Sequence, residues 1–157
     1  MVVIVVPLAT AHASAPSDGR EPWATVNVCD TAKSPNTIGV RASMPGSRRG
    51  LQERYMRFVV QYYSRAEERW KRVTAGGDSG YLSVGKGRAT RQLGRSFRIQ
   101  PAAGQPVLLR GRVYFQWRLK GVVVRRAHAT TRKGHRSSAG DDPRGYSAAT
   151  CTITADS

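Results

Sequence analysis

Apolar and polar residues alternate with a period of two along most of this chain. Residues 107–119 show the pattern most clearly, because polar or amphipathic residues separate Val113, Phe115 and Trp117. Such a period places successive side chains on opposite faces of a β-strand, so that one face can be buried. The same pattern, bounded by turn-forming residues, predicts strands over residues 24–29, 37–44, 56–63, 70–73, 81–84, 97–99, 107–119, 122–131 and 149–154.

Residues 51–73 carry two competing patterns. Leu51, Tyr55 and Phe58 begin a series that recurs every three or four residues as far as Val73, which is the stripe of an amphipathic helix. Residues 56–63 also alternate with a period of two and are dense in β-forming side chains. We favour two strands joined at residues 64–69, because the other segments have the strand period. A single helix is the alternative.

Turn-forming residues separate the predicted strands, and two of these stretches, 75–80 and 85–94, are rich in Gly. Short strands with no alternation of strand and helix favour an antiparallel sandwich or barrel. We therefore predict an all-β fold, a single antiparallel β-sandwich of about seven to nine strands. Two other tryptophans have separate expectations: Trp70 should lie in the core and Trp23 over an edge of the sandwich. The residues expected to face outward are Arg57, Arg112 and Arg118. The residues expected to face inward are Val26, Val28, Phe58, Val60, Val113, Phe115 and Trp117.

The N-terminus has the pattern of an export signal. Residues 1–15 contain no charged residue, and an apolar run is followed by the small residues Ala13-Ser14-Ala15, which resemble a signal-peptidase site. No Lys or Arg precedes the run, and the alternative is a buried strand, which Pro7 fits poorly. The run is too short to span a bilayer, which takes about 20 apolar residues. We predict a signal peptide at 1–15, a flexible lead at 16–23, a β-sandwich domain at 24–154, and secretion or a place in the cell envelope.

The chain has two cysteines, Cys29 and Cys151, which lie in the first and last predicted strands. In an oxidising compartment we expect one disulfide between them, tying together the two ends of the domain. The alternative is a pair of reduced, buried thiols that pack as small apolar residues.

Cysteines on the terminal strands with tryptophans between them resemble the framework of an immunoglobulin-like sandwich. In antibody-type domains a corner Tyr precedes the second cysteine by two residues, whereas Ala149 stands there in this chain. Residues 23–154 also resemble, in overall texture, the exported Arg-rich β-sandwich proteins common in actinobacteria. The resemblance implies a fold and no activity.

The chain is strongly basic, with a net charge of +16, and Arg outnumbers Lys by 21 to 5. Such a charge attracts polyanions through long-range fields and counterion release. The favoured role of the charge is solubility and protection of sheet edges, and polyanion binding is the alternative. If the charge binds a partner, we expect anionic envelope polymers or other polyanions and disfavour nucleic acid. The arginines proposed to bind a polyanion are Arg57, Arg88, Arg91, Arg112, Arg118, Arg125 and Arg126.

Candidate catalytic and metal-binding residues are few. Gly77-Asp78-Ser79-Gly80 resembles the nucleophile segment of chymotrypsin-like proteases, but Tyr81 follows it in place of Gly, and the one histidine upstream is His12. His128 and His135 lack further ligands nearby in sequence, and Asp141-Asp142 lacks the spacing of a calcium loop, so a solvated loop is expected there. We predict no cofactor, no metal and no enzymatic activity. The predicted function is an exported structural or interaction module; the alternatives are a nucleic-acid-binding protein and a hydrolase with an unrecognised site.

Overall fold

The computed structural model describes residues 21–137 and 139–154. The predicted signal peptide at 1–15 therefore lies outside the described residues. Within them the chain has no helix, and so none that is long and apolar enough to cross a membrane. The described part of the chain forms β1 (Trp23–Thr31), β2 (Ser34–Met44), β3 (Glu53–Ser64), β4 (Arg69–Arg72), β5 (Asp78–Gly85), β6 (Arg91–Arg98), β7 (Val107–Leu119), β8 (Val122–Thr130) and β9 (Cys151–Ile153).

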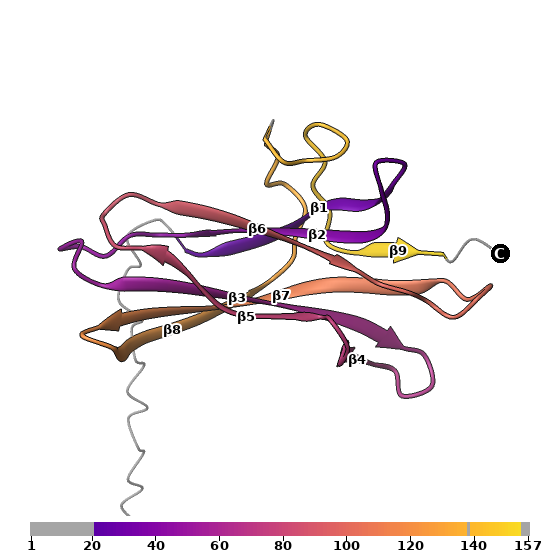
Figure 1. The fold of residues 1–157 in the computed structure, drawn as a ribbon, viewed down its shortest axis with the longest axis horizontal. Helices are drawn as coiled ribbons and strands as arrows, with labels where there is room; N and C mark the ends of the chain where they lie inside the picture. Colours follow the sequence, from indigo (N-terminus) through magenta and orange to yellow (C-terminus); the bar gives the residue numbers. More distant parts are fainter. Residues whose placement is uncertain (1–20, 138, 155–157) are drawn as a thin grey trace, which may run out of the picture.

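These strands form two antiparallel sheets that lie face to face (Figure 1). The three-stranded sheet has the order β1-β2-β6. The six-stranded sheet has the order β4-β3-β7-β8, with β5 also paired to β3 and β9 also paired to β7. The predicted antiparallel β-sandwich is therefore confirmed.

Residues 51–73 form two strands, as we favoured, and no helix. The long strand β3 pairs with β7 over ten residue pairs, from Glu53↔Arg118 to Tyr62↔Leu109. Tertiary pairing with the β-rich strand β7 thus selects the period of two over the helical stripe. The predicted loop at residues 85–94 is too long, because residues 91–94 pair with β2 and belong to β6.

The core lies between the sheets and consists of the inward-facing residues of both. Phe58, Val60, Val113, Phe115 and Trp117 are all at most 1% exposed, as the alternation predicts. The two sheets approach closely at Gly111, where a Cβ atom would lie 2.8 Å from both methyl carbons of Val40. A residue without a side chain is needed there for this packing.

Val28 is buried but does not face the core. A β-bulge between Val26 and Val28 reverses the alternation, so that Val28 stands opposite Gly39 on the outer face of the three-stranded sheet. The same shift turns Cys29 inward, opposite the core residue Ile38. The prediction that Val28 faces inward is therefore wrong, because period-two reasoning does not anticipate a bulge.

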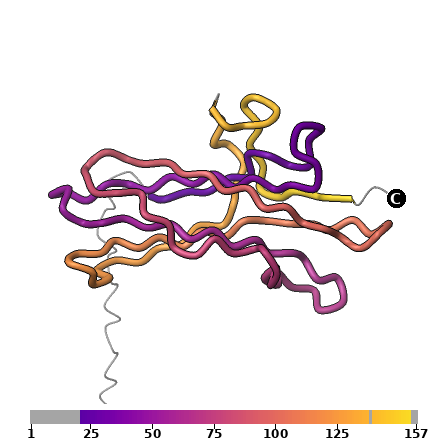
Figure 2. The backbone as a smooth tube through the Cα atoms, viewed as in Figure 1, coloured from indigo at the N-terminus to yellow at the C-terminus, as the bar shows by residue number. Residues whose placement is uncertain are grey.

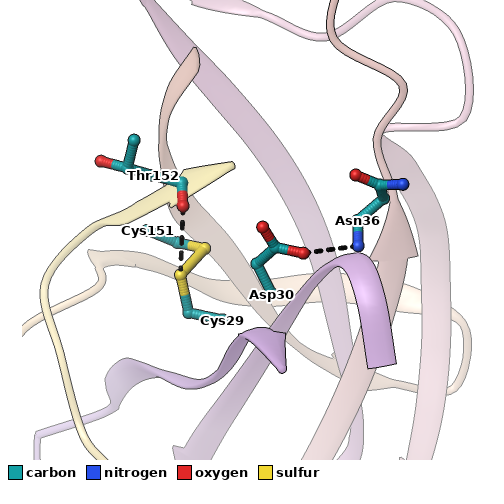
Figure 3. Close-up of a disulfide and its surroundings, with 5 residues drawn as sticks. All are labelled: Cys29, Asp30, Asn36, Cys151 and Thr152. Carbon is teal, nitrogen blue, oxygen red and sulfur yellow. Dashed lines mark hydrogen bonds between the residues drawn. A yellow bond between two sulfur atoms is a disulfide. The ribbon is translucent and has the colours of Figure 1, made fainter. Parts of the chain in front are cut away.

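The disulfide between Cys29 and Cys151 is present (Figure 3). The Cα atoms of the two cysteines are 5.4 Å apart, inside the usual range for a bridged pair. Because β1 belongs to the three-stranded sheet and β9 to the six-stranded sheet, the bond joins the two layers. Beside it, the backbone N–H of Asn36 donates to the Asp30 carboxylate at 2.7 Å and closes the β1–β2 hairpin.

The described residues between β8 and β9, 131–137 and 139–150, cover the free edge and outer face of β1 and are called the capping segment here (Figure 2). Val26 and Ala148 exchange backbone hydrogen bonds of 2.9 and 3.0 Å. The Asp141 carboxylate is fully buried and accepts a hydrogen bond of 3.2 Å from Nε of Arg41, whose side chain is also buried. The expectation of a solvated loop is wrong for Asp141, because the segment folds back over a buried guanidinium that needs a charged partner.

Candidate functional site

The outer face of the six-stranded sheet gathers arginines and aromatic rings. We call it the Arg–aromatic face. Its strands alternate so that the core residues point inward and the basic and aromatic residues point outward. The residues of the face are Tyr55, Arg57 and Tyr63 on β3, Trp70 and Arg72 on β4, Tyr81 on β5, Arg110, Arg112, Tyr114 and Arg118 on β7, and Arg126 and His128 on β8.

The structure brings together four of the seven arginines proposed from the sequence, namely Arg57, Arg112, Arg118 and Arg126. The other three lie elsewhere. Arg125 is opposite Trp117, and its guanidinium carbon lies 4.3 Å from the centre of that ring, on the inner side of the sheet. Arg88 lies in the β5–β6 connection and Arg91 in β6 of the other sheet.

One side of the Arg–aromatic face is electrically compensated. Asp78 accepts hydrogen bonds from Nε of Arg57 at 2.8 Å and from Nη2 of Arg72 at 2.6 Å. The hydrogen bond from Arg57, with smaller contributions from the Gly80 N–H and the Arg57 and Arg72 charges, lowers the pKa of Asp78 to about 2 against the opposing effect of burial. The Asp78 carboxylate thus forms ion pairs with the guanidinium groups of both Arg57 and Arg72.

The centre of the face has no such compensation. Arg110 and Arg112 follow one another along the outer side of β7, and within the described residues neither pairs with a carboxylate. Nε of Arg110 donates to the neutral side-chain oxygen of Gln61 at 2.9 Å. Burial and the neighbouring Arg112 charge lower the pKa of Arg110. Nε of Arg112 is buried and has no hydrogen-bond partner among the described residues.

The guanidinium groups of the face lie over aromatic rings. Arg110 is 4.2 Å from the ring centre of Trp70, and Arg118 is 4.0 Å from that of Tyr55. Arg118 also donates to the side-chain oxygen of Gln116 at 2.8 Å. Stacking of this kind holds a guanidinium plane in place without neutralising its charge. The guanidinium groups of Arg110 and Arg118 are thus held in place and keep the positive charge to which an anion would bind.

The residues that resemble catalytic or metal-binding motifs take part in local structure. The Ser79 hydroxyl accepts from the Phe58 N–H at 2.9 Å and donates to the Gly80 carbonyl at 2.8 Å. The His135 ring stacks on Trp23 with centroids 4.1 Å apart, and burial, with Arg41 and Arg132, lowers its pKa. Among the described residues no group of three His, Cys, Asp or Glu side chains has the arrangement of a metal site.

Trp70 differs from its predicted place, and the burial of Arg54 was not predicted. Trp70 lies on the Arg–aromatic face, packed edge-on against Tyr63, and not in the core. Arg54 is a charged residue and is nevertheless fully buried. Its guanidinium donates to the carbonyls of Gly85, Ala89 and Lys86 at 3.1, 2.7 and 3.3 Å. The alternation in the sequence already indicates this burial, because Arg54 lies two residues before Met56 and so shares the inward face of Met56 and Phe58.

Comparison of the chain with protein-family models, with curated protein sequences and with solved structures gave no match.

Proposed function

We propose that this protein is a non-enzymatic binding module for anionic polymers, and that the Arg–aromatic face is its binding surface. The observation that carries the proposal is the uncompensated pair Arg110 and Arg112 at the centre of the face, with a buried Arg112 nitrogen that lacks a partner. Both side chains are half-buried and have no carboxylate partner among the described residues, so a phosphate, sulfate or carboxylate oxygen could pair with the accessible part of each guanidinium group without breaking an existing ion pair.

The pattern of charge along the face supports a polymer as the ligand. Arg118 and Arg126 continue the row of cations beyond the central pair. Asp78 lies at the opposite side of the sheet with Arg57 and Arg72, and Glu53, which accepts from the Tyr55 hydroxyl at 3.2 Å, lies opposite Arg118. An extended chain with repeated negative groups could contact several of these arginines together. Counterion release then supplies most of the affinity.

We propose further that the protein is exported and acts in the cell envelope or outside the cell. The disulfide is compatible with an oxidising compartment, where such bonds persist. Anionic envelope polymers would be the partners available to the Arg–aromatic face there. Nucleic acid is the second polymer to test, because nucleobases stack on guanidinium planes as well as on aromatic rings.

The double variant Arg110→Gln/Arg112→Gln tests the assignment. We expect it to weaken binding to immobilised heparin and to a glycerol-phosphate polymer by at least about tenfold at low salt, and to reduce the log–log salt slope by about two. The matched control is Arg65→Gln/Arg144→Gln, which removes the same charge from two exposed residues outside the face.

The two variants separate a local site from general attraction. Equal losses in both would show that net charge alone drives binding and would refute the Arg–aromatic face as the site. A single-stranded oligonucleotide that outcompetes a glycerol-phosphate polymer of equal charge would favour nucleic acid over an envelope polymer.

A further inference from the structure

One end of the sandwich, remote from the centre of the Arg–aromatic face, exposes large apolar side chains. Three connections meet there, at the left of Figure 1: residues 45–52 between β2 and β3, residues 86–90 between β5 and β6, and the hairpin turn at residues 120–121 between β7 and β8. We call them together the tip. On the tip or next to it are Leu51, Leu119, Val122 and Val124, which are 59%, 40%, 67% and 48% exposed. Apolar exposure gathered in one place marks an interaction surface.

The tip is also basic. Its three connections contain Arg48, Arg49, Lys86, Arg88 and Lys120 and no acidic residue. The adjoining Glu53 is 3.4 Å from the Lys86 ammonium and offsets one of these charges. The remaining cations surround the apolar side chains without close carboxylates among the described residues.

Basic and apolar groups share a concave site on the tip. A pocket of about 440 Å³ is lined by Ser47, Arg48, Arg49, Leu51, Gln52 and Leu119. Two guanidinium groups and two leucines in one pocket suit an amphiphile that has an anionic head and an apolar tail.

The tip is held rigid from inside the core. The buried Arg54 guanidinium binds three carbonyls of residues 85–89, and the Trp117 indole N–H donates to the Pro45 carbonyl at 3.2 Å. The two longer connections are also packed together, since a Cβ on Gly46 would lie 2.0 Å from the Arg88 carbonyl oxygen. A surface that is already ordered loses little conformational entropy on binding.

From these features we infer that the tip docks on the surface of a bilayer containing anionic phospholipids. Leu51, Leu119 and Val122 enter the boundary between headgroups and acyl chains, and Arg48 and Arg49 bind lipid phosphate groups. The protein lies on the membrane and does not span it. A second copy of the chain is a poor occupant, because two basic tips repel one another. The inference does not rest on the binding of polymers by the Arg–aromatic face.

Vesicle co-sedimentation of the full chain tests the inference, with phosphatidylcholine vesicles that contain or lack phosphatidylglycerol. We expect binding only to the vesicles with phosphatidylglycerol. Each basic residue near an anionic leaflet strengthens binding by roughly fivefold, so Arg48→Gln/Arg49→Gln should weaken it by about 25-fold. Loss of one inserted leucine in Leu51→Ser should weaken it by about tenfold.

Matched variants make the test specific. Arg65→Gln/Arg144→Gln removes the same charge elsewhere, and Leu108→Ser changes a 36% exposed leucine toward the other end of β7; both should bind within about twofold of the wild type. Arg110→Gln/Arg112→Gln should keep more of its vesicle binding than Arg48→Gln/Arg49→Gln, which separates this inference from the polymer site. Equal effects of the tip and control variants, or equal binding to both kinds of vesicle, would overturn it.

Discussion

The disulfide between Cys29 and Cys151 should contribute a large part of the stability of the domain. The bond closes a segment of 122 residues, and in the chain-entropy description a loop of this length is worth about 5 kcal/mol. A domain of this size has a total free energy of unfolding of about 5–15 kcal/mol. The double variant Cys29→Ala/Cys151→Ala should therefore unfold at a much lower denaturant concentration.

Contacts that do not depend on the bond reduce this figure. The strand β9 has three residues, and its fully buried Ile153 contributes roughly 1.5–3 kcal/mol of apolar burial whether or not the bond is present. The hydrogen bonds between Val26 and Ala148 also hold the capping segment on β1. We expect a net loss of about 3–5 kcal/mol.

Unfolding in guanidinium chloride, followed by circular dichroism, measures the loss in free energy of unfolding. The oxidised wild type, the reduced wild type and the double alanine variant are compared in the same experiment. The dependence of the free energy on denaturant should be steeper without the bond, because the uncrosslinked unfolded chain exposes more surface. Reduced wild type and double variant should agree within about 1 kcal/mol, since both lack the crosslink. A loss below about 1 kcal/mol in both would refute the reasoning and show that backbone pairing and packing alone hold the terminal strands.

Two further predictions concern charged residues. Asp78 has its pKa lowered to about 2, so its ion pairs stabilise the fold above the ordinary carboxyl pKa and are lost as the pH falls toward 2. Asp78→Asn should thus cost about 1 kcal/mol at pH 7, since the pair is partly exposed, and much less at pH 2, where about half of the Asp78 carboxyls are protonated in the folded state, as measured by thermal unfolding; a loss that is the same at both pH values would contradict the assignment. Arg54→Met should cost about 3 kcal/mol, because it leaves three carbonyls without their donor, and Arg54→Lys should recover part of this; a fully stable Arg54→Met, measured by urea unfolding, would show that water replaces the guanidinium.

Most of the fold follows from the sequence because its strands have one buried face. The alternation in residues 107–119 gives the bounds of β7 and its inward residues correctly, and Lys120-Gly121 forms the predicted two-residue turn, with φ of 49° and 82°. The bulge at Val28 and the burial of Asp141 were missed for a different reason. The capping segment buries Asp141 and contacts β1 at the bulge, through hydrogen bonds between residues more than a hundred positions apart.

The candidate site was predictable only in part. Alternation places Arg57, Arg112 and Arg118 on an outer face, but the register between strands decides which arginines become neighbours. Trp70 lies in a strand of four residues, too short for its own pattern to show which side it faces. Its pairing with Tyr63 places it beside Arg110, a residue 40 positions away in sequence that was not among the proposed binding residues.

The arginines of this chain carry one charge each, yet the structure gives them different physical roles. Arg54 is enclosed and organises a connection, Arg57 is neutralised by Asp78, and Arg110 and Arg112 remain uncompensated on a surface. A net charge of +16 adds all of these together and cannot distinguish them. An anion gains most where desolvated guanidinium groups have no carboxylate of their own, because no existing ion pair must be broken. The expected order of effects in polymer binding is therefore Arg110 and Arg112 first, Arg118 next, and Arg57 last, and single Gln variants at these positions measure that order directly.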